Sequence, residues 1–177
     1  MKFSLVAISA AFIAGVSAVP AGTPTASAPQ ATESLGWAQH WIKTESGQFL
    51  QSATPWQPGD AVLGSPLTAG EFNIVSTSLV DTVHTATMMY ATVAPVTAGA
   101  TMLKVSFEAG LITPASGGTF AWSGAEKTLT WSRSDSTFTG WIACDNVLFA
   151  NLKSTVPAGC SSVTISSFVS TFATDSA

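Results

Sequence analysis

Residues 101–111 alternate between apolar and polar side chains, which is the pattern of a β-strand with one buried face. The apolar set is Leu103, Val105, Phe107, Ala109 and Leu111, and Lys104, Ser106 and Glu108 fall between them. A period of two residues places each set on its own face, because successive side chains of a strand point to opposite sides. This segment therefore predicts a strand that covers a core.

Other segments with strand character follow at short intervals, separated by Gly, Pro or Ser. They are 72–80, 86–94, 120–122, 129–131, 138–143, 146–152 and 163–172. No tract between them has the pattern of a crossover helix, which disfavours a parallel sheet. We therefore expect an all-β protein, an antiparallel β-sandwich or small barrel of about eight short strands.

Several of these segments carry finer predictions. Residues 123–127 connect two aromatic strands and predict a hairpin with a loop of about four or five residues. Phe72–Val80 and Ala86–Ala94 alternate poorly, so either both faces of each strand are covered or the strand boundaries lie elsewhere. Apolar residues change parity within 163–172, and a bulge near Ser166 and Ser167 would reconcile them.

The composition excludes several classes of protein. Charged residues make up 9% of the chain, against about 25% in an average globular domain, whereas 46% of the residues are hydrophobic. A disordered charged tail is the reverse of this, and six Lys and Arg against ten Asp and Glu cannot form a nucleic-acid-binding stripe. Two Cys are too few for a disulfide-dense miniprotein. One folded domain is expected.

The N-terminus has the pattern of an export signal. Lys2 precedes an apolar run over 3–16, and Val16-Ser17-Ala18 supplies the small residues that a signal peptidase recognises. The alternative, a membrane anchor, is disfavoured because the run is shorter than a span of ~20 residues. We expect a signal peptide at 1–18, a secreted mature chain with no membrane span, and a flexible leader rich in Pro, Ala, Ser and Thr at 19–34.

Residues 35–66 are expected to form a Trp-containing extension that packs on a β domain at 67–177. Trp37 and Trp41 are four residues apart and would share one face of a helix, with Ser34 as its cap and Gly47 at its end. This predicts a short N-terminal helix. Pro and Gly residues over 55–66 predict a loop.

Cys144 and Cys160 are the only cysteines. In an oxidising compartment they can form one intramolecular disulfide, which would join the strand at 138–143 to the start of the last strand. Free thiols or an intermolecular bridge are the alternatives. A metal site would need further ligands close by, and Asp145 alone does not supply them.

No catalytic, cofactor-binding or metal-binding residues are predicted, and no cofactor is expected. His40 and His84 are the only histidines, and the Asp81–His84 spacing is a weak metal or triad signal. A glycosidase needs two carboxyl groups ~5–9 Å apart. The candidate carboxylates are Glu71, Asp81, Glu108, Glu126, Asp135 and Asp145, and the sequence brings no two of them together.

Six tryptophans are many for a chain of this length. Exposed coplanar indole rings would form a platform for sugar rings, whereas core packing is the ordinary alternative. Trp122, Trp131 and Trp141 lie in predicted strands, which favours core packing. Trp37, Trp41 and Trp56 lie outside them and would either cover an open face of the sheet or be exposed.

The C-terminal third resembles the PhiA-like small secreted proteins of fungal cell walls. The matching segments are 129–131, Phe138-Thr139-Gly140-Trp141-Ile142-Ala143-Cys144-Asp145, and Val156-Pro157-Ala158-Gly159-Cys160-Ser161-Ser162-Val163-Thr164-Ile165. The similarity covers about residues 119–170. It departs upstream, where this chain has no further Cys and the segment 35–58 has no counterpart.

This resemblance implies a fungal, secreted, wall-associated β domain without enzymatic activity. The expected role is non-catalytic association with the cell wall or extracellular matrix, with wall polysaccharide or other wall proteins as partners. A secreted effector or ligand-binding β module is the alternative function. A small hydrolase with an unrecognised carboxylate site is a second alternative.

Overall fold

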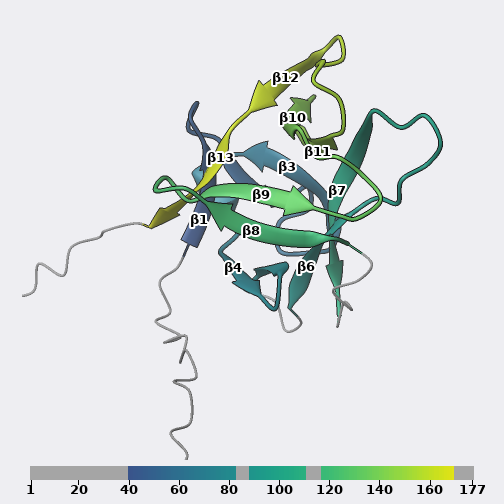
Figure 1. Ribbon diagram of the computed structural model, residues 1–177. Coiled ribbons are helices and arrows are strands. Elements are labelled where there is room, and N and C mark those ends of the chain that lie inside the picture. The colour runs from purple at the N-terminus through teal and green to yellow at the C-terminus, as the bar shows by residue number, and fades with distance from the viewer. Residues whose placement is uncertain (1–39, 83–87, 111–116, 170–177) are drawn as a thin grey trace, which may run out of the picture. The chain divides into compact units, whose positions relative to one another are not determined.

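A computed structural model describes residues 40–82, 88–110 and 117–169 (Figure 1). All described residues belong to one compact unit. The expected signal peptide at 1–18 and leader at 19–34, together with Trp37 and His84, lie outside the described ranges.

The described residues form an all-β, antiparallel structure, which confirms the predicted fold class. One short 3₁₀ turn, η1 (Pro66–Thr68), interrupts them. The strands are β1 (His40–Thr44), β2 (Phe49–Ser52), β3 (Gly59–Gly64), β4 (Phe72–Val75), β5 (Ser78–Asp81), β6 (Met89–Val93), β7 (Met102–Ala109), β8 (Thr119–Ser123), β9 (Thr128–Ser132), β10 (Gly140–Cys144), β11 (Val147–Asn151), β12 (Cys160–Val163) and β13 (Ile165–Val169).

The strands make one nearly closed, barrel-like sheet. Their order is β4-β5-β6-β7-β11-β3-β2-β1-β13-β9-β8, and β7 also pairs with β3. The first half of β7, residues 102–104, pairs with β11, and residues 106–107 pair with β3. Strand β11 therefore lies between β7 and β3 along only part of their length. Strand β10 pairs with β11 and β12 and extends the sheet at the top of Figure 1.

Two strand predictions are largely confirmed. In β7, Leu103, Val105 and Phe107 are buried while Lys104 and Glu108 are exposed, as the alternation predicts. Ala109, expected on the buried face, is exposed, and Leu111 lies outside the described residues. The predicted hairpin is also confirmed, because β8 and β9 pair directly across a four-residue loop at 124–127.

The segment 72–80 is a hairpin rather than one strand. Strands β4 and β5 pair with each other, and the turn between them places Ser76 and Thr77 at φ values of 48° and 72°. Two successive residues with positive φ are typical of a type I′ turn, which matches the twist of the flanking strands. The turn accounts for the poor alternation, because the chain reverses in the middle of the segment.

The predicted N-terminal helix is wrong for the described residues 40–44, which form strand β1. Neighbouring strands decide this, because β1 pairs with β2 on one side and with β13 on the other. The predicted loop over 55–66 is also wrong in part, since residues 59–64 form β3. Residues 40–64 therefore supply three strands from the interior of the sheet order, where an extension packing on a β domain was expected.

The predicted bulge near Ser166 and Ser167 is not formed. Pairing between β1 and β13 runs without interruption from His40–Val169 to Thr44–Ile165. Apolar residues of both parities occur because β13 has apolar contacts on both faces: Ile165 is buried in the core, whereas Phe168 lies on the opposite face against Trp41.

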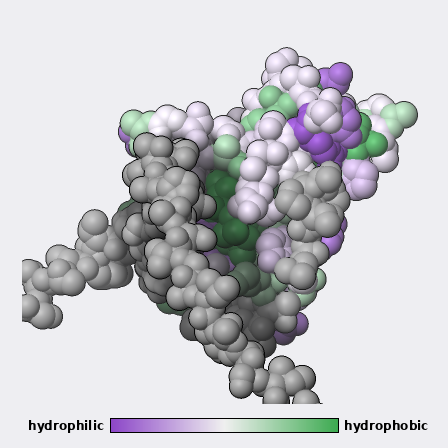
Figure 2. Space-filling view, turned by 60° about the horizontal axis from the view of Figure 1, so that its bottom comes forward, coloured by the Kyte–Doolittle hydropathy of each residue, from purple (hydrophilic) through white to green (hydrophobic). Residues whose placement is uncertain are grey.

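Aromatic side chains fill much of the interior. Phe72 and Phe107 stack with ring centroids 5.6 Å apart, and Phe120 stacks on Trp141 at 6.3 Å. Phe138 contacts Trp141 at 4.8 Å between centroids. Burial of these rings is the main stabilising contribution of such a core. Figure 2, turned so that the bottom of Figure 1 comes forward, shows apolar residues set back beside residues of intermediate hydropathy.

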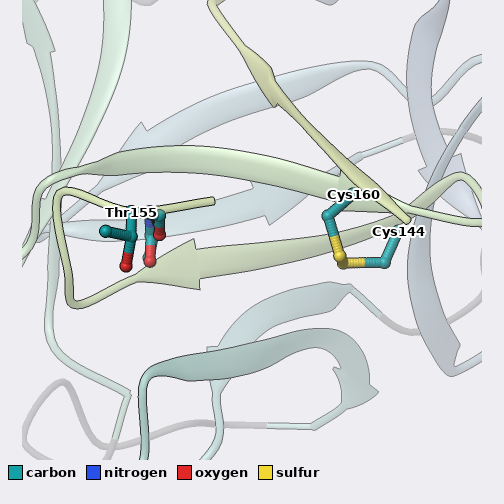
Figure 3. The surroundings of a disulfide bond; sticks show 4 residues. Cys144, Thr155 and Cys160 are labelled. Atoms are coloured by element: carbon teal, nitrogen blue, oxygen red, sulfur yellow. Dashed lines mark hydrogen bonds between the residues drawn. A yellow bond between two sulfur atoms is a disulfide. The ribbon is translucent and has the colours of Figure 1, made fainter. Parts of the chain in front are cut away.

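The end of β10 is covalently joined to the start of β12 (Figure 3). Cys144 and Cys160 lie opposite each other in the ladder and form the expected disulfide. Asn151, at the end of β11, holds the connection that follows, because its Nδ2 donates to the Thr155 carbonyl at 3.3 Å and its Oδ1 accepts from the Lys153 amide. Burial of this polar side chain is therefore compensated by hydrogen bonds.

The two ends of the sheet meet at a seam between β8 and the β4–β5–β6 region. A backbone bond between described residues bridges it there, from the Phe120 amide to the Thr77 carbonyl at 2.8 Å. Arg133, which follows β9, donates to the carbonyl oxygens of Val93 and Ala94 at 3.2 and 3.1 Å. The guanidinium therefore fastens one end of this seam to the end of β6.

Replacing Arg133 by Ala should lower the free energy of unfolding by about 2 kcal/mol, because a largely buried charged donor that satisfies two carbonyls is lost. Lys104 is the matched control, since it forms an exposed ion pair with Asp60, and Lys104→Ala should cost less than about 1 kcal/mol. Denaturant unfolding measures both values. Equal costs for the two variants would show that the seam does not depend on Arg133.

Removing the disulfide with the double variant Cys144→Ala and Cys160→Ala should lower the free energy of unfolding by about 3 kcal/mol. The bridge closes a loop with a sequence separation of 16, and its loss frees the unfolded chain. Denaturation of the oxidised protein, the reduced protein and the double variant tests this. If all three unfold at the same denaturant concentration, the bridge contributes nothing to stability.

Candidate functional site

Strand β1 presents different side chains on its two faces. Ile42 and Thr44 are 0% and 4% exposed, whereas Trp41 and Lys43 are half-buried. Since alternate side chains of a strand point in opposite directions, Trp41 and Lys43 lie on the face turned away from the core. The sequence signal for this strand is its content of residues with high β-propensity, Trp41, Ile42 and Thr44, because apolar and polar residues do not alternate over 41–44.

The neighbouring strands bring two further aromatic rings to this outer face. Trp41 lies opposite Phe168 of β13, and Lys43 lies opposite Phe49 of β2. Phe49 and Phe168 are both half-buried. Strand pairing thus gathers three rings that are distant in the sequence, and we refer to Trp41, Phe49 and Phe168 as the outer aromatic cluster.

The outer aromatic cluster is centred on Phe168. Trp41 stacks against it with centroids 6.2 Å apart and an interplanar angle of 28°. Phe49 meets it edge-on at 6.4 Å. The Lys43 ammonium lies 3.9 Å from the centre of the Phe168 ring, which is a cation–π contact. These contacts fix the orientation of the rings before any ligand is bound.

A cavity of about 240 Å³ adjoins the outer aromatic cluster through Lys43. The register explains its position, because Lys43 of β1, Ser166 of β13 and Thr128 of β9 lie side by side across three strands. Each lining residue carries a hydroxyl, carboxylate or ammonium group, beside the apolar carbons that make up most of the exposed lining. We call this cavity the polar pocket, and its lining residues are Lys43, Thr44, Glu45, Glu126, Thr128, Thr164 and Ser166.

Two carboxylates and one ammonium give the polar pocket its charge. In the described ranges, ion pairs link Lys104 to Asp60 and Arg133 to Asp135, and neither Glu45 nor Glu126 takes part in one. Both glutamates are exposed. Their oxygens can therefore accept hydrogen bonds from a ligand rich in hydroxyl groups, and charged acceptors form the stronger bonds of this kind.

The polar pocket does not have the features that a glycosidase acid requires. Such an acid is a carboxyl group shielded from water, paired with a second one at a defined distance. Glu45 follows β1 and Glu126 lies in the β8–β9 loop, and both side chains are exposed to solvent. The arrangement is suited to holding a polar ligand.

The structure scatters the carboxylates that the sequence singled out, and only Glu126 lines the polar pocket. Asp135 pairs with Arg133 at 2.7 Å, and Glu108 accepts from the Thr92 hydroxyl at 3.3 Å. Asp81 is buried in β5, and Asp145 lies in the turn between β10 and β11 with a φ of 49°. Glu71 immediately precedes β4.

The tryptophans divide into inward and outward sets. Trp131 and Trp141 are buried, which confirms core packing, and their indole N–H groups donate to the carbonyls of Gly117 and Leu129, each at 2.7 Å. Trp122 is partly buried against the core. Trp41 belongs to the outer aromatic cluster, and Trp56 is 44% exposed.

His40 precedes Trp41 in β1, and its Nδ1 is buried without a hydrogen-bond partner. In the part of the chain that the structure describes, no group of three or more His, Cys, Asp or Glu side chains could hold a metal ion. Within the same ranges, no helix is long and apolar enough to cross a membrane.

No protein-family model, curated protein or solved structure matches this chain. Its function therefore has to be argued from its own residues.

Because Trp41 lies outside the core, Trp41→Ala should cost about 1–2 kcal/mol of stability, mainly through lost stacking on Phe168. Trp141→Ala should cost about 3–5 kcal/mol, because it opens a cavity in the core and leaves the Leu129 carbonyl without its donor. Thermal and denaturant unfolding compare the two, and failure of the Trp141 variant to fold is the extreme form of the same result. A Trp41 variant as damaged as the Trp141 variant would place Trp41 in the core.

Proposed function

We propose that this chain is a non-catalytic extracellular protein that binds saccharide through the outer aromatic cluster and the polar pocket. The observation that carries this proposal is their adjacency. Partly exposed aromatic rings can stack on the apolar faces of sugar rings, while carboxylates and hydroxyls beside them bind the sugar hydroxyl groups. Lys43 lines the polar pocket and contacts Phe168 of the cluster, so it joins the two parts.

The sequence supplies the proposed setting. An export signal at 1–18 directs the chain out of the cell, and the resemblance of residues 119–170 to PhiA-like proteins suggests a fungal cell wall or matrix. Wall polysaccharide is the proposed ligand in that setting. A chain with few charges and many Ser and Thr residues is also consistent with a hydrated, hydroxyl-rich surrounding.

The packing of the outer aromatic cluster favours a saccharide over a large apolar ligand. The three rings already contact one another and Lys43, so they offer ring faces and edges rather than an empty apolar cavity. Each residue that lines the adjoining space carries a hydroxyl or charged group beside its apolar carbons. A ligand that alternates apolar ring faces with hydroxyl groups satisfies both surfaces.

Affinity electrophoresis in gels containing laminarin or yeast mannan, and titration with chitohexaose, test the proposal. The wild-type protein should bind at least one of these ligands. Trp41→Ala should weaken that binding about tenfold, which corresponds to the loss of ~1.4 kcal/mol of stacking energy. The double variant Glu45→Gln and Glu126→Gln should weaken it several-fold, because neutral amides are poorer acceptors.

Val156→Ala is the matched control, since Val156 is an exposed apolar residue in the β11–β12 connection and lies outside both parts of the site. It should bind as the wild type does. Circular dichroism confirms that each variant is folded. Absence of binding to every ligand would contradict the proposal, and so would shortening of an oligosaccharide by the wild type that stops in the glutamate variant, because the site would then be catalytic.

A further inference from the structure

The two carboxylates of the polar pocket have no cationic partner among the described residues. Glu45 and Glu126 both line the cavity, and neither takes part in an ion pair within the described ranges. On the outer face of β7, by contrast, Lys104 pairs with Asp60 at 2.9 Å. The polar pocket therefore offers two charged acceptors to a ligand.

The lysines beside these carboxylates do not neutralise them directly. Lys43 lines the cavity, but its ammonium lies 3.9 Å from the centre of the Phe168 ring, and it forms no ion pair with a described residue. A cation–π contact of this kind holds the ammonium against the ring. Lys127 follows Glu126 in the chain, but it is not among the residues that line the cavity.

Hydrogen bonds hold the turn that carries Glu45. Thr44 is buried, and its Oγ1 accepts from the Gln48 amide at 3.1 Å and lies 2.8 Å from Ser46 Oγ. The Gln48 side chain also donates to Asn146 Oδ1 at 3.4 Å. The turn is thus held from both ends before a ligand binds, which reduces the entropy lost on binding.

The loop that carries Glu126 is tied to the same part of the sheet. Within the loop, the Lys127 amide donates to the Gly124 carbonyl at 3.3 Å, and the Lys127 carbonyl accepts from the Ser167 amide of β13 at 3.0 Å. Strand β13 pairs in turn with β1, which ends immediately before Glu45. Strand pairing therefore keeps the two carboxylates at one cavity.

We propose that the polar pocket selects a saccharide with protonated amino groups, a polymer of glucosamine, over neutral saccharides; this inference rests on the proposed function. An ammonium group donates charge-assisted hydrogen bonds to a carboxylate, and these are stronger than the bonds that a neutral hydroxyl donates. The net charge of −4 on the chain attracts the same ligand at longer range.

Two other charged ligands fit the polar pocket less well. An anionic saccharide would bring its own carboxylates or sulfates toward Glu45 and Glu126, and like charges repel. A metal ion needs more ligands, and in the described part of the chain no group of three or more His, Cys, Asp or Glu side chains could hold one. The amino groups of glucosamine are cations that two carboxylates can bind.

A matched pair of hexamers tests this inference. The glucosamine hexamer and chitohexaose have the same ring and linkage and differ in N-acetylation, which removes the positive charge. Titrations contain EDTA and use a pH at which the amino groups are protonated and the glutamates are ionised. We expect the wild type to bind the glucosamine hexamer about fivefold more tightly, as two partly exposed ion pairs allow. In about 1 M salt the preference should fall below about twofold.

Charge-removing variants locate the source of the preference. Glu45→Gln and Glu126→Gln should each lower it about twofold, and the double variant should bind both hexamers about equally. Glu108→Gln is the matched control, because Glu108 is an exposed carboxylate of β7 outside the polar pocket and its replacement removes the same charge. It should keep the wild-type preference. Circular dichroism confirms that each variant is folded.

Equal or tighter binding of chitohexaose by the wild type would overturn the inference and leave the proposed function in place, and so would binding of laminarin or mannan without either hexamer. An equal loss of preference in Glu108→Gln and in the pocket variants would also overturn it, since the attraction would then come from overall charge. If the wild type binds no saccharide, both proposals fail.

Discussion

Backbone hydrogen bonding at the ends of a sheet constrains this fold more than any other single requirement. A row of strands ends in two edges with unpaired amides and carbonyls, and such edges invite pairing with other chains. Here the end strands are β4 and β8, and their neighbourhoods are brought together by the Phe120–Thr77 bond and by Arg133 on the carbonyls at the end of β6. Among the described residues, these contacts comprise one backbone bond and two bonds donated by the Arg133 side chain.

This near-closure of the sheet determines which tryptophan side chains are buried in the core and which lie on the outer face. In the interior, an indole N–H needs an acceptor. The Trp131 N–H donates to the carbonyl of Gly117, which precedes β8, and the Trp141 N–H donates to the carbonyl of Leu129 in β9. Strand β1 lies between β2 and β13, so its inward residues are fixed in the core and Trp41 is held outside in a definite register. The same sheet therefore builds the core on one face and a pre-oriented ring cluster on the other.

Much of the fold could be predicted because its signals are local. Alternation in β7, the β8–β9 hairpin and the single possible cysteine pair depend on residues close in sequence or on simple counting. Predictions failed where a distant strand decided the outcome. Trp37 and Trp41 have helical spacing, but residues 40–44 gain two strand partners, and pairing of β13 with β1 and β9 removes the need for a bulge at Ser166 and Ser167. Of the candidate site, the sequence pointed only to Glu126, as a candidate carboxylate, and to Trp41, as a possible part of a sugar platform.

The sequence by itself determined the class of structure, its antiparallel character and the cysteine pairing, because period-two patterning, turn residues and composition act within a few residues of one another. Only the tertiary structure decided which tryptophans are buried, and that Lys43, Glu126 and Ser166 line one cavity. Those outcomes depend on register between strands more than a hundred residues apart in the chain, such as β1 and β13. Local patterns carry no information about that register, because each strand shows only which of its faces is apolar and not which partner it will meet.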